Sequence, residues 1–114
     1  MAYSMRLLLA SAVVVTWLGA DAAFADALDG EWCREAESLT IQGPNILTPG
    51  GTQTTGDYAR HHFSYVIPAG EPQAGATVEI SQLSEEEMDL RIVSAEQDAA
   101  PGAWERWRRC KVTS

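Results

Sequence analysis

Short runs in which apolar and polar residues alternate, separated by glycine and proline, dominate the chain after residue 25. Alternation with a period of two is typical of a strand that buries one face, and no long stretch there has the 3.6-residue period of a helix. The clearest run covers residues 57–67, and we expect it to form one strand. Its predicted core face comprises Ala59, His61, Phe63, Tyr65 and Ile67.

Further strands are predicted on both sides of this run, over residues 30–34, 38–42, 46–48, 77–83, 88–92 and 103–112. Pro49-Gly50-Gly51 is typical of a tight turn, because proline fixes φ and glycine tolerates a positive φ. Six or seven short strands with short connections form an antiparallel meander. A sheet this small covers its core by curling into a barrel or folding into two layers. We therefore predict an all-β fold, a small closed or nearly closed barrel, with a two-layer β-sandwich as the alternative.

The first 25 residues have a different pattern. Residues 1–6 carry one cation, residues 7–18 are uncharged and apolar, and Ala23-Phe24-Ala25 precedes Asp26. This layout is typical of a secretory signal peptide with an A-x-A cleavage site. The apolar run has 12 residues, fewer than the ~20 that span a bilayer. We predict cleavage after Ala25.

Cleavage there divides the chain into a signal peptide, residues 1–25, and a single small β-domain, residues 26–114. Because Asp26 and not a cysteine follows the cut, no lipid anchor is expected. We expect the mature domain to be soluble, periplasmic or secreted, and monomeric.

Two cysteines, Cys33 and Cys110, lie near the two ends of the predicted mature domain. Export places them in an oxidising compartment, where a disulfide persists. Closing this long loop stabilises a small domain by roughly 4–5 kcal/mol in the chain-entropy model. A free thiol pair or a two-cysteine metal site are the alternatives, but no Cys-x-x-Cys spacing supports either.

The composition is acidic, with a formal net charge of −8. This charge argues against nucleic acid or an anionic membrane surface as a partner, and it fits either simple solubility or a partner with a basic face. Four cations crowd the last nine residues: Arg106, Arg108, Arg109 and Lys111. They can pair with the acidic run at residues 85–87.

Gly30-Glu31-Trp32 resembles the G-x-W motif of the calycin group, which includes lipocalins and small bacterial periplasmic protease inhibitors. The resemblance implies that Trp32 caps the floor of a barrel and that a basic residue of the last strand, Arg108 or Arg109, packs across its ring. Lipocalins are much longer than this chain. The periplasmic inhibitors act through an amino-terminal trunk, and only residues 26–29 precede the motif here. The resemblance therefore implies a barrel and no particular activity.

Catalytic and metal-binding patterns are weak. His61 and His62 are neighbours on a predicted strand, so their side chains point to opposite faces and do not share a metal. Ser64, His62 and Asp57 contain the residue types of a catalytic triad, but nothing resembles a nucleophile elbow or a paired-carboxylate site. The glycines near residue 50 open no helix, so nucleotide binding is unsupported. We expect no catalytic residues, no metal and no cofactor.

Two features are candidates for binding. Trp104 and Trp107 alternate with arginines, and three residues apart on a strand they face opposite sides, so we expect one in the core and one exposed. An exposed tryptophan beside arginines is typical of interface hot spots, although the same residues can stack within the fold. Pro49, Gly50 and Gly51 lie in a segment that suits either recognition or turn geometry.

The sequence thus favours an exported, non-enzymatic β-barrel that binds another protein, as an inhibitor-like or envelope accessory factor. A carrier of a small apolar ligand is the alternative. A filled barrel favours the protein binder, and an open cavity favours the carrier.

Overall fold

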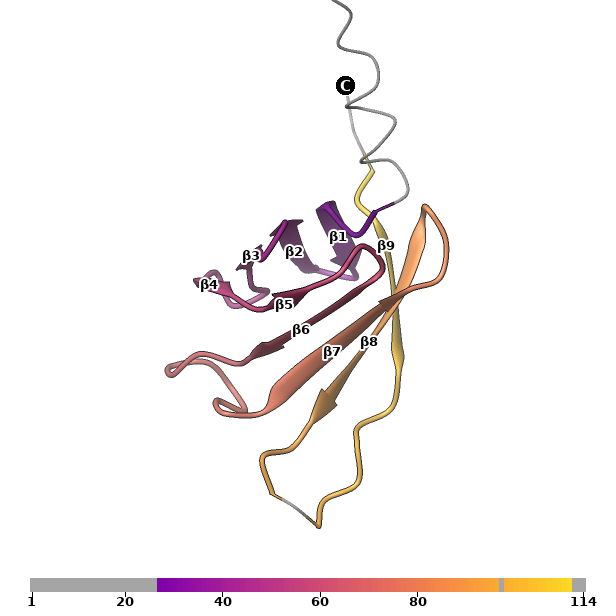
Figure 1. Cartoon of the computed structure of the whole chain (residues 1–114). Helices are drawn as coiled ribbons and strands as arrows, with labels where there is room; N and C mark the ends of the chain where they lie inside the picture. The colour runs from indigo at the N-terminus through magenta and orange to yellow at the C-terminus, as the bar shows by residue number, and fades with distance from the viewer. Residues whose placement is uncertain (1–26, 97, 112–114) are drawn as a thin grey trace, which may run out of the picture.

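The computed structural model describes residues 27–96 and 98–111. They form an all-β antiparallel meander that curls into a nearly closed barrel (Figure 1). The predicted all-β barrel is therefore confirmed, and the two-layer alternative is wrong. The predicted signal peptide, residues 1–25, lies outside the described residues. Within the described ranges, no helix has the length and hydropathy needed to cross a membrane.

The described part of the chain contains nine strands. They are β1 (Gly30–Arg34), β2 (Glu37–Gln42), β3 (Asn45–Leu47), β4 (Gln53–Thr55), β5 (Asp57–Tyr58), β6 (His62–Val66), β7 (Thr77–Gln82), β8 (Glu87–Val93) and β9 (Glu105–Arg109). They form one sheet in the order β4-β3-β2-β1-β9-β8-β7-β6-β5. Each pair of neighbours is antiparallel, and β1 pairs with both β2 and β9.

The strands β4 and β5 stand at the two ends of this order, yet only Gly56 separates them in the chain. Residues 53–58 therefore pair with β3 through their first half and with β6 through their second half, which brings the ends of the sheet together. A Cβ at Gly56 would collide with the carbonyl oxygen of Ser64 and the side chains of Phe63 and Tyr65. Glycine lets the backbone approach β6 closely at this bend.

The prediction of one continuous strand over residues 57–67 is wrong. The chain forms β5, turns at residues 59–61 and returns as β6, with Asp57 opposite Ser64 and Tyr58 opposite Phe63. The Ala59 N–H donates to the carbonyl oxygen of His62 at 2.8 Å and fixes the turn. Because the alternation stops at the turn, the expected core positions at 59 and 61 are exposed.

The predicted count of six or seven strands is also too low. The two additional strands are β4 and the short β5. In β4, Gln53-Thr54-Thr55 has no apolar residue and therefore no alternation that a sequence pattern could detect. The segment forms a strand because its backbone pairs with that of β3, with Thr54 opposite Ile46.

Residues on the inward face of the strands fill the barrel. The buried apolar residues are Ala27, Leu28, Trp32, Leu39, Ile41, Ile46, Phe63, Tyr65, Ile67, Ala76, Val78, Ile80, Met88, Leu90 and Trp107. The two buried tryptophans are 0% and 2% exposed and are the largest members of this core. Trp107 is thus the core tryptophan of the predicted pair, and Trp104 is the exposed one at 46%.

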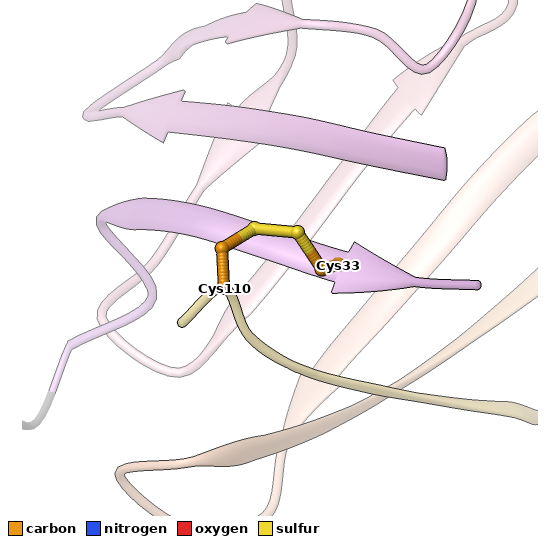
Figure 2. Close-up of a disulfide and its surroundings, with 2 residues drawn as sticks. All are labelled: Cys33 and Cys110. Carbon is orange, nitrogen blue, oxygen red and sulfur yellow. A yellow bond between two sulfur atoms is a disulfide. The ribbon is translucent and has the colours of Figure 1, made fainter. Parts of the chain in front are cut away.

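The predicted disulfide is confirmed. Cys33 in β1 and Cys110 directly after β9 are joined, with their Cα atoms 4.9 Å apart (Figure 2). The free-thiol and two-cysteine metal alternatives are therefore wrong. The bond links the first and last strands of the meander, so it reinforces the β1–β9 pairing that closes the barrel.

Candidate functional site

The end of the barrel where β1 begins and β9 ends is its floor, and Trp32 and Arg109 close it. Trp32 lies opposite Arg109 in the β1–β9 ladder. The guanidinium carbon of Arg109 lies 4.0 Å from the centroid of the indole ring, and the indole Nε1–H donates to the carbonyl oxygen of Leu28 at 2.8 Å. Of the two arginines that the sequence proposed, Arg109 covers the ring. Arg108 points outward and pairs with Glu87 at 2.8 Å.

Backbone carbonyls hold the Arg109 guanidinium in place. It donates to the carbonyl oxygens of Asp29 at 2.5 Å, Ala27 at 2.6 Å and Glu85 at 2.7 Å. Desolvation lowers the pKa of Arg109, against the opposing effect of nearby carboxylates that include Glu86. The Arg109 guanidinium remains charged, because arginine is the most basic side chain and does not lose its proton in proteins.

Gly30 has a specific role at this floor. Its φ is +123°, a conformation that residues with a side chain rarely adopt, and a Cβ there would lie 2.6 Å from Nη1 of Arg109. Glycine therefore leaves the room through which the guanidinium reaches the indole of Trp32. This contact gives a physical reason for the glycine and the tryptophan of the G-x-W pattern.

Asp29 ties the floor to two other parts of the barrel. Its carboxylate accepts hydrogen bonds from the backbone N–H of Gly43, at 2.8 Å, and from the hydroxyl of Tyr58. The hydrogen bond to Asp29, followed by burial, raises the pKa of Tyr58 to about 12. The floor is therefore filled and cross-linked, and it is a structural feature of the barrel.

The opposite, open end carries the turn between β1 and β2 and the loops at residues 48–52, 67–76 and 94–104. A cavity of about 320 Å³ opens there. Its apolar wall consists of Tyr65, Ile67, Val78, Leu90, Ile92 and Trp107. Pro49 and Gly50 also line it. Three of the five residues proposed for binding therefore meet at this cavity, and Gly51 and Trp104 do not line it.

Three carboxylates from separate elements line the same cavity: Glu37 of β2, Glu71 of the loop after β6, and Glu105 of β9. The guanidinium of Arg34 lies 4.0 Å from Glu105, at the limit of an ion pair. The pKa of Tyr65 is raised by burial, and then by the charges of Glu71 and Glu37. The charges of Glu71 and Glu37 therefore act on Tyr65 in the cavity wall.

Glu71 is held in a fixed position. Its carboxylate accepts a hydrogen bond of 2.6 Å from the hydroxyl of Thr48, which is 2% exposed, and the Thr48 hydroxyl accepts one of 3.1 Å from the Thr52 N–H. A Cβ at Gly50 would collide with the Glu71 carboxylate. Glycine at position 50 thus leaves room for the Glu71 carboxylate in this position, whereas Gly51, with φ of +89°, supplies the turn.

Trp107, one of the residues that line the cavity, carries a buried polar group. Its Nε1–H is buried and has no hydrogen-bond acceptor among the described residues. Buried N–H groups are paired in most structures, because an unpaired donor loses its hydration without compensation. The Trp107 indole therefore keeps an unpaired donor within the described part of the barrel core.

Charge is distributed unevenly between the two ends. The described residues of the open end, within 34–37, 48–52, 67–76 and 94–105, carry six carboxylates and one cation, Arg34. The described residues of the floor end, within 27–31, 42–45, 57–62, 82–87 and 108–111, carry six carboxylates and four cations. The surplus of negative charge among the described residues is therefore larger at the open end, where the cavity lies.

Trp104 lies outside the barrel, next to the open end. The guanidinium of Arg91 lies 4.4 Å from the centroid of its ring, and Glu79 fixes that guanidinium at 2.8 Å. Trp104 borders a groove of about 480 Å³ on the outer face, together with Tyr58 and His62. The exposed tryptophan predicted from the sequence is thus held in a defined orientation.

Two arginines of the carboxyl-terminal segment form ion pairs on the outer face of β8 and β9. Arg106 contacts Asp89 at 2.7 Å and Glu87 at 3.5 Å, and Arg108 contacts Glu87. The proposed pairing with residues 85–87 is therefore formed, through the side chain of Glu87 and the carbonyl of Glu85. These exposed pairs stabilise the fold only modestly.

The other sequence candidates do not assemble. His61 and His62 are both exposed, and no group of three potential metal ligands occurs in the described ranges. Asp57 and Ser64 lie opposite each other in the β5–β6 ladder. No side-chain hydrogen bond joins His62, Ser64 and Asp57 in this part of the chain.

Sequence reasoning missed the three carboxylates of the cavity. Glu37 and Glu105 share the inward parity of Leu39 and Trp107, two residues further along, so a carboxylate at a core position of a strand end was the available signal. Glu71 lies in a loop and gave no such signal. No family model, curated protein or solved structure matches this chain.

Proposed function

We propose that this chain is an exported, non-enzymatic β-barrel domain that binds another protein at its open end. The observation that carries the proposal is the charge of that end, whose described segments carry six carboxylates and a single cation, with three of the carboxylates lining an apolar cavity. Such a surface attracts a basic face and repels acidic ones, which gives both steering and specificity.

Trp104 supports the same proposal. It is adjacent to Glu105 in the chain, so a partner that covers the rim also reaches the indole. Because Arg91 and Glu79 already orient this side chain, little conformational entropy is lost on binding. Rigid, exposed tryptophans are typical of interface hot spots.

The filled interior argues against a carrier of a bulky apolar ligand. Trp32 and Trp107 occupy the barrel below the cavity, together with Leu28 and Met88, and all four are at most 2% exposed. The geometry of Trp32 and Arg109 supports the resemblance to the calycin group, and the disulfide supports an oxidising compartment. We therefore favour an exported, calycin-like protein binder of the inhibitor or accessory-factor type.

The experiment is a comparative capture from the exported fraction of the producing organism, with mass spectrometry of the retained proteins. The bait proteins are the parent, a rim variant with Glu37→Gln, Glu71→Gln and Glu105→Gln, and a floor-end control with Glu31→Gln, Glu85→Gln and Glu86→Gln. The two variants change the formal charge equally, at opposite ends of the barrel.

We expect one protein to be retained by the parent and the control, lost from the rim variant, and released by moderate salt. Trp104→Ala should weaken retention, whereas Leu83→Ala, at an exposed position beside the floor, should not. A protein retained equally by all three baits would contradict binding at the open end.

A further inference from the structure

We propose that the groove beside Trp104, on the outer face of the barrel, is a binding site for a neutral sugar in its pyranose ring form. The groove measures about 480 Å³, within the usual range of small-molecule sites. It shares no lining residue with the cavity at the open end. The proposal therefore goes beyond the protein partner assigned to that end and does not depend on it, although Trp104 serves both surfaces.

Serines of two neighbouring strands form the floor of the groove. Ser64 of β6 and Ser81 of β7 alternate with the buried Phe63 and Ile80, so both serines point outward. They line the groove and are half-buried, and neither hydroxyl has a hydrogen-bond partner in the described ranges. Two hydroxyls that can each donate and accept are therefore available to a ligand.

Two further polar side chains face the same groove. Asp57 lies opposite Ser64 in the β5–β6 ladder, and His62 lies opposite Ser81 in the β6–β7 ladder. Neither side chain forms a hydrogen bond or an ion pair within the described part of the chain. The hydroxyl groups at the edge of a sugar ring match this set, because a carboxylate accepts from them, whereas serine and a neutral imidazole both donate and accept.

The charges in the groove favour a neutral ligand. The Glu79 carboxylate and the Arg91 guanidinium already pair with each other at 2.8 Å. An anion would also meet the carboxylate of Asp57 and a chain whose formal net charge is −8. Asp57 is exposed, so water screens its charge and gives a cation little advantage.

Trp104 supplies the apolar surface that a sugar ring requires. The C–H groups on one face of a pyranose pack against an aromatic ring, whose face is electron-rich, while the hydroxyls point sideways. The Trp104 indole is 46% exposed, and Arg91 lies 4.4 Å from its ring centroid and fixes it before a ligand arrives. The groove over β2, β3 and β4 also contains hydroxyls and amides, but none of its lining residues is aromatic.

The test is a titration of the ¹⁵N-labelled exported protein followed by nuclear magnetic resonance, with the indole signal assigned by Trp104→Phe. The probes are the methyl glycosides of glucose, galactose and mannose, together with the anionic D-glucuronate. Cyclohexanol has a ring but a single hydroxyl, and glycerol has hydroxyls but no ring. We expect at least one glycoside to shift the Trp104 indole signal and the amide signals of Ser64 and Ser81, with a millimolar dissociation constant.

Variants of the groove test the role of the hydroxyls. In Ser64→Ala with Ser81→Ala, the affinity for that glycoside should fall about tenfold, as expected for the loss of two hydrogen bonds. Ser38→Ala is the matched control, because Ser38 is an exposed serine of β2 outside the groove, and the affinity should not change. The single substitutions Ser64→Ala and Ser81→Ala serve if the double variant does not give a folded spectrum.

The outcomes separate this proposal from its alternatives. A shift with a glycoside, without one from D-glucuronate, cyclohexanol or glycerol, supports a site for a neutral sugar. No shift of Trp104 with any of the three glycosides, an equal shift with cyclohexanol or D-glucuronate, or an unchanged affinity in the serine variants would overturn the inference. The protein partner is tested separately, because Ser64→Ala with Ser81→Ala as bait should retain the same protein as the parent.

Discussion

The guanidinium of Arg109 and the indole of Trp32 form one unit at the floor of the barrel, 4.0 Å from guanidinium carbon to ring centroid. The two residues come from the first and last strands and lie directly opposite each other. The same guanidinium binds the carbonyl oxygens of Ala27 and Asp29. The contact therefore closes the ring of strands and also fixes the segment that leads into β1.

Trp32→Ala should destabilise the domain by about 3–5 kcal/mol, because it removes a fully buried indole and leaves a cavity. Small domains have total stabilities of roughly 5–15 kcal/mol, so much of the population would unfold. Urea denaturation followed by circular dichroism measures the change. Trp104→Ala, at an exposed position, is the control and should lose less than about 1 kcal/mol. Equal unfolding midpoints for the parent and Trp32→Ala would show that Trp32 is not a core residue.

Arg109→Lys should cost about 1–3 kcal/mol even though the charge is retained. A lysine ammonium cannot reproduce the planar fork that binds three carbonyl oxygens and covers an indole. Arg108→Lys, whose side chain is exposed and pairs with Glu87, should change stability by less than about 0.5 kcal/mol. Chemical denaturation of both variants provides the comparison, and similar losses would argue against a special role for Arg109.

Gly50→Ala should cost about 1–2 kcal/mol, because the added methyl group displaces the Glu71 carboxylate from the Thr48 hydroxyl. In a Glu71→Ala background the same substitution should cost less than about 0.5 kcal/mol, since the colliding group is absent. A double-mutant cycle by thermal or urea denaturation measures this coupling. Additive losses would mean that Gly50 is required for its backbone conformation and not for Glu71.

Asp29→Asn should lower the pKa of Tyr58 from about 12 towards its ordinary value of about 10, because it removes the charge that disfavours the phenolate. Tyr58 and Tyr65 are the tyrosines of residues 26–114, and burial raises the pKa of Tyr65 as well. Ultraviolet titration of the mature protein should therefore detect little phenolate at pH 10–11. In Asp29→Asn, about one tyrosine should ionise in that range.

The sign of the effect on stability follows from the same shift. Because the pKa of Tyr58 is raised in the folded state, the protonated tyrosine contributes to the free energy of unfolding. This contribution is complete below pH 10 and is lost as the pH rises to about 12. The parent should therefore lose stability over this interval, and Asp29→Asn should lose less. A steeper loss in the variant would contradict the assignment of Asp29 as the partner of Tyr58.

Export should remove residues 1–25, because Ala23-Phe24-Ala25 provides the small residues that a signal peptidase requires. Intact-mass measurement on protein from the exported fraction should give the mass of residues 26–114 with two hydrogens fewer than the sum of its residues, owing to the disulfide. An exported protein that retains residues 7–18 would contradict a soluble mature domain.

Local patterns in the sequence determined the fold class. Alternation in residues such as Val78 and Ile80 predicts a strand with one buried face, and glycine and proline mark the turns between strands. The sequence contains two cysteines, so Cys33 and Cys110 are the one pair that can form an intramolecular disulfide. The prediction of one buried and one exposed tryptophan is confirmed for Trp107 and Trp104, although Trp104 directly precedes β9 and, contrary to the prediction, is not part of the strand. The strands and turns depend on near neighbours in the chain and the disulfide on the number of cysteines, which is why the sequence alone could predict them.

Only the tertiary structure decided which residues meet across the barrel. The cross-strand register places Arg109 and not Arg108 over Trp32, and a shift of one residue would have exchanged them. The turn at residues 59–61 interrupts a run of alternation because β5 must turn back to pair with β6. Glu37, Glu71 and Glu105 are far apart in sequence, and curling of the sheet brings them to one cavity. Register and closure arise from pairing between distant segments, and no local pattern of hydrophobic and polar residues contains that information.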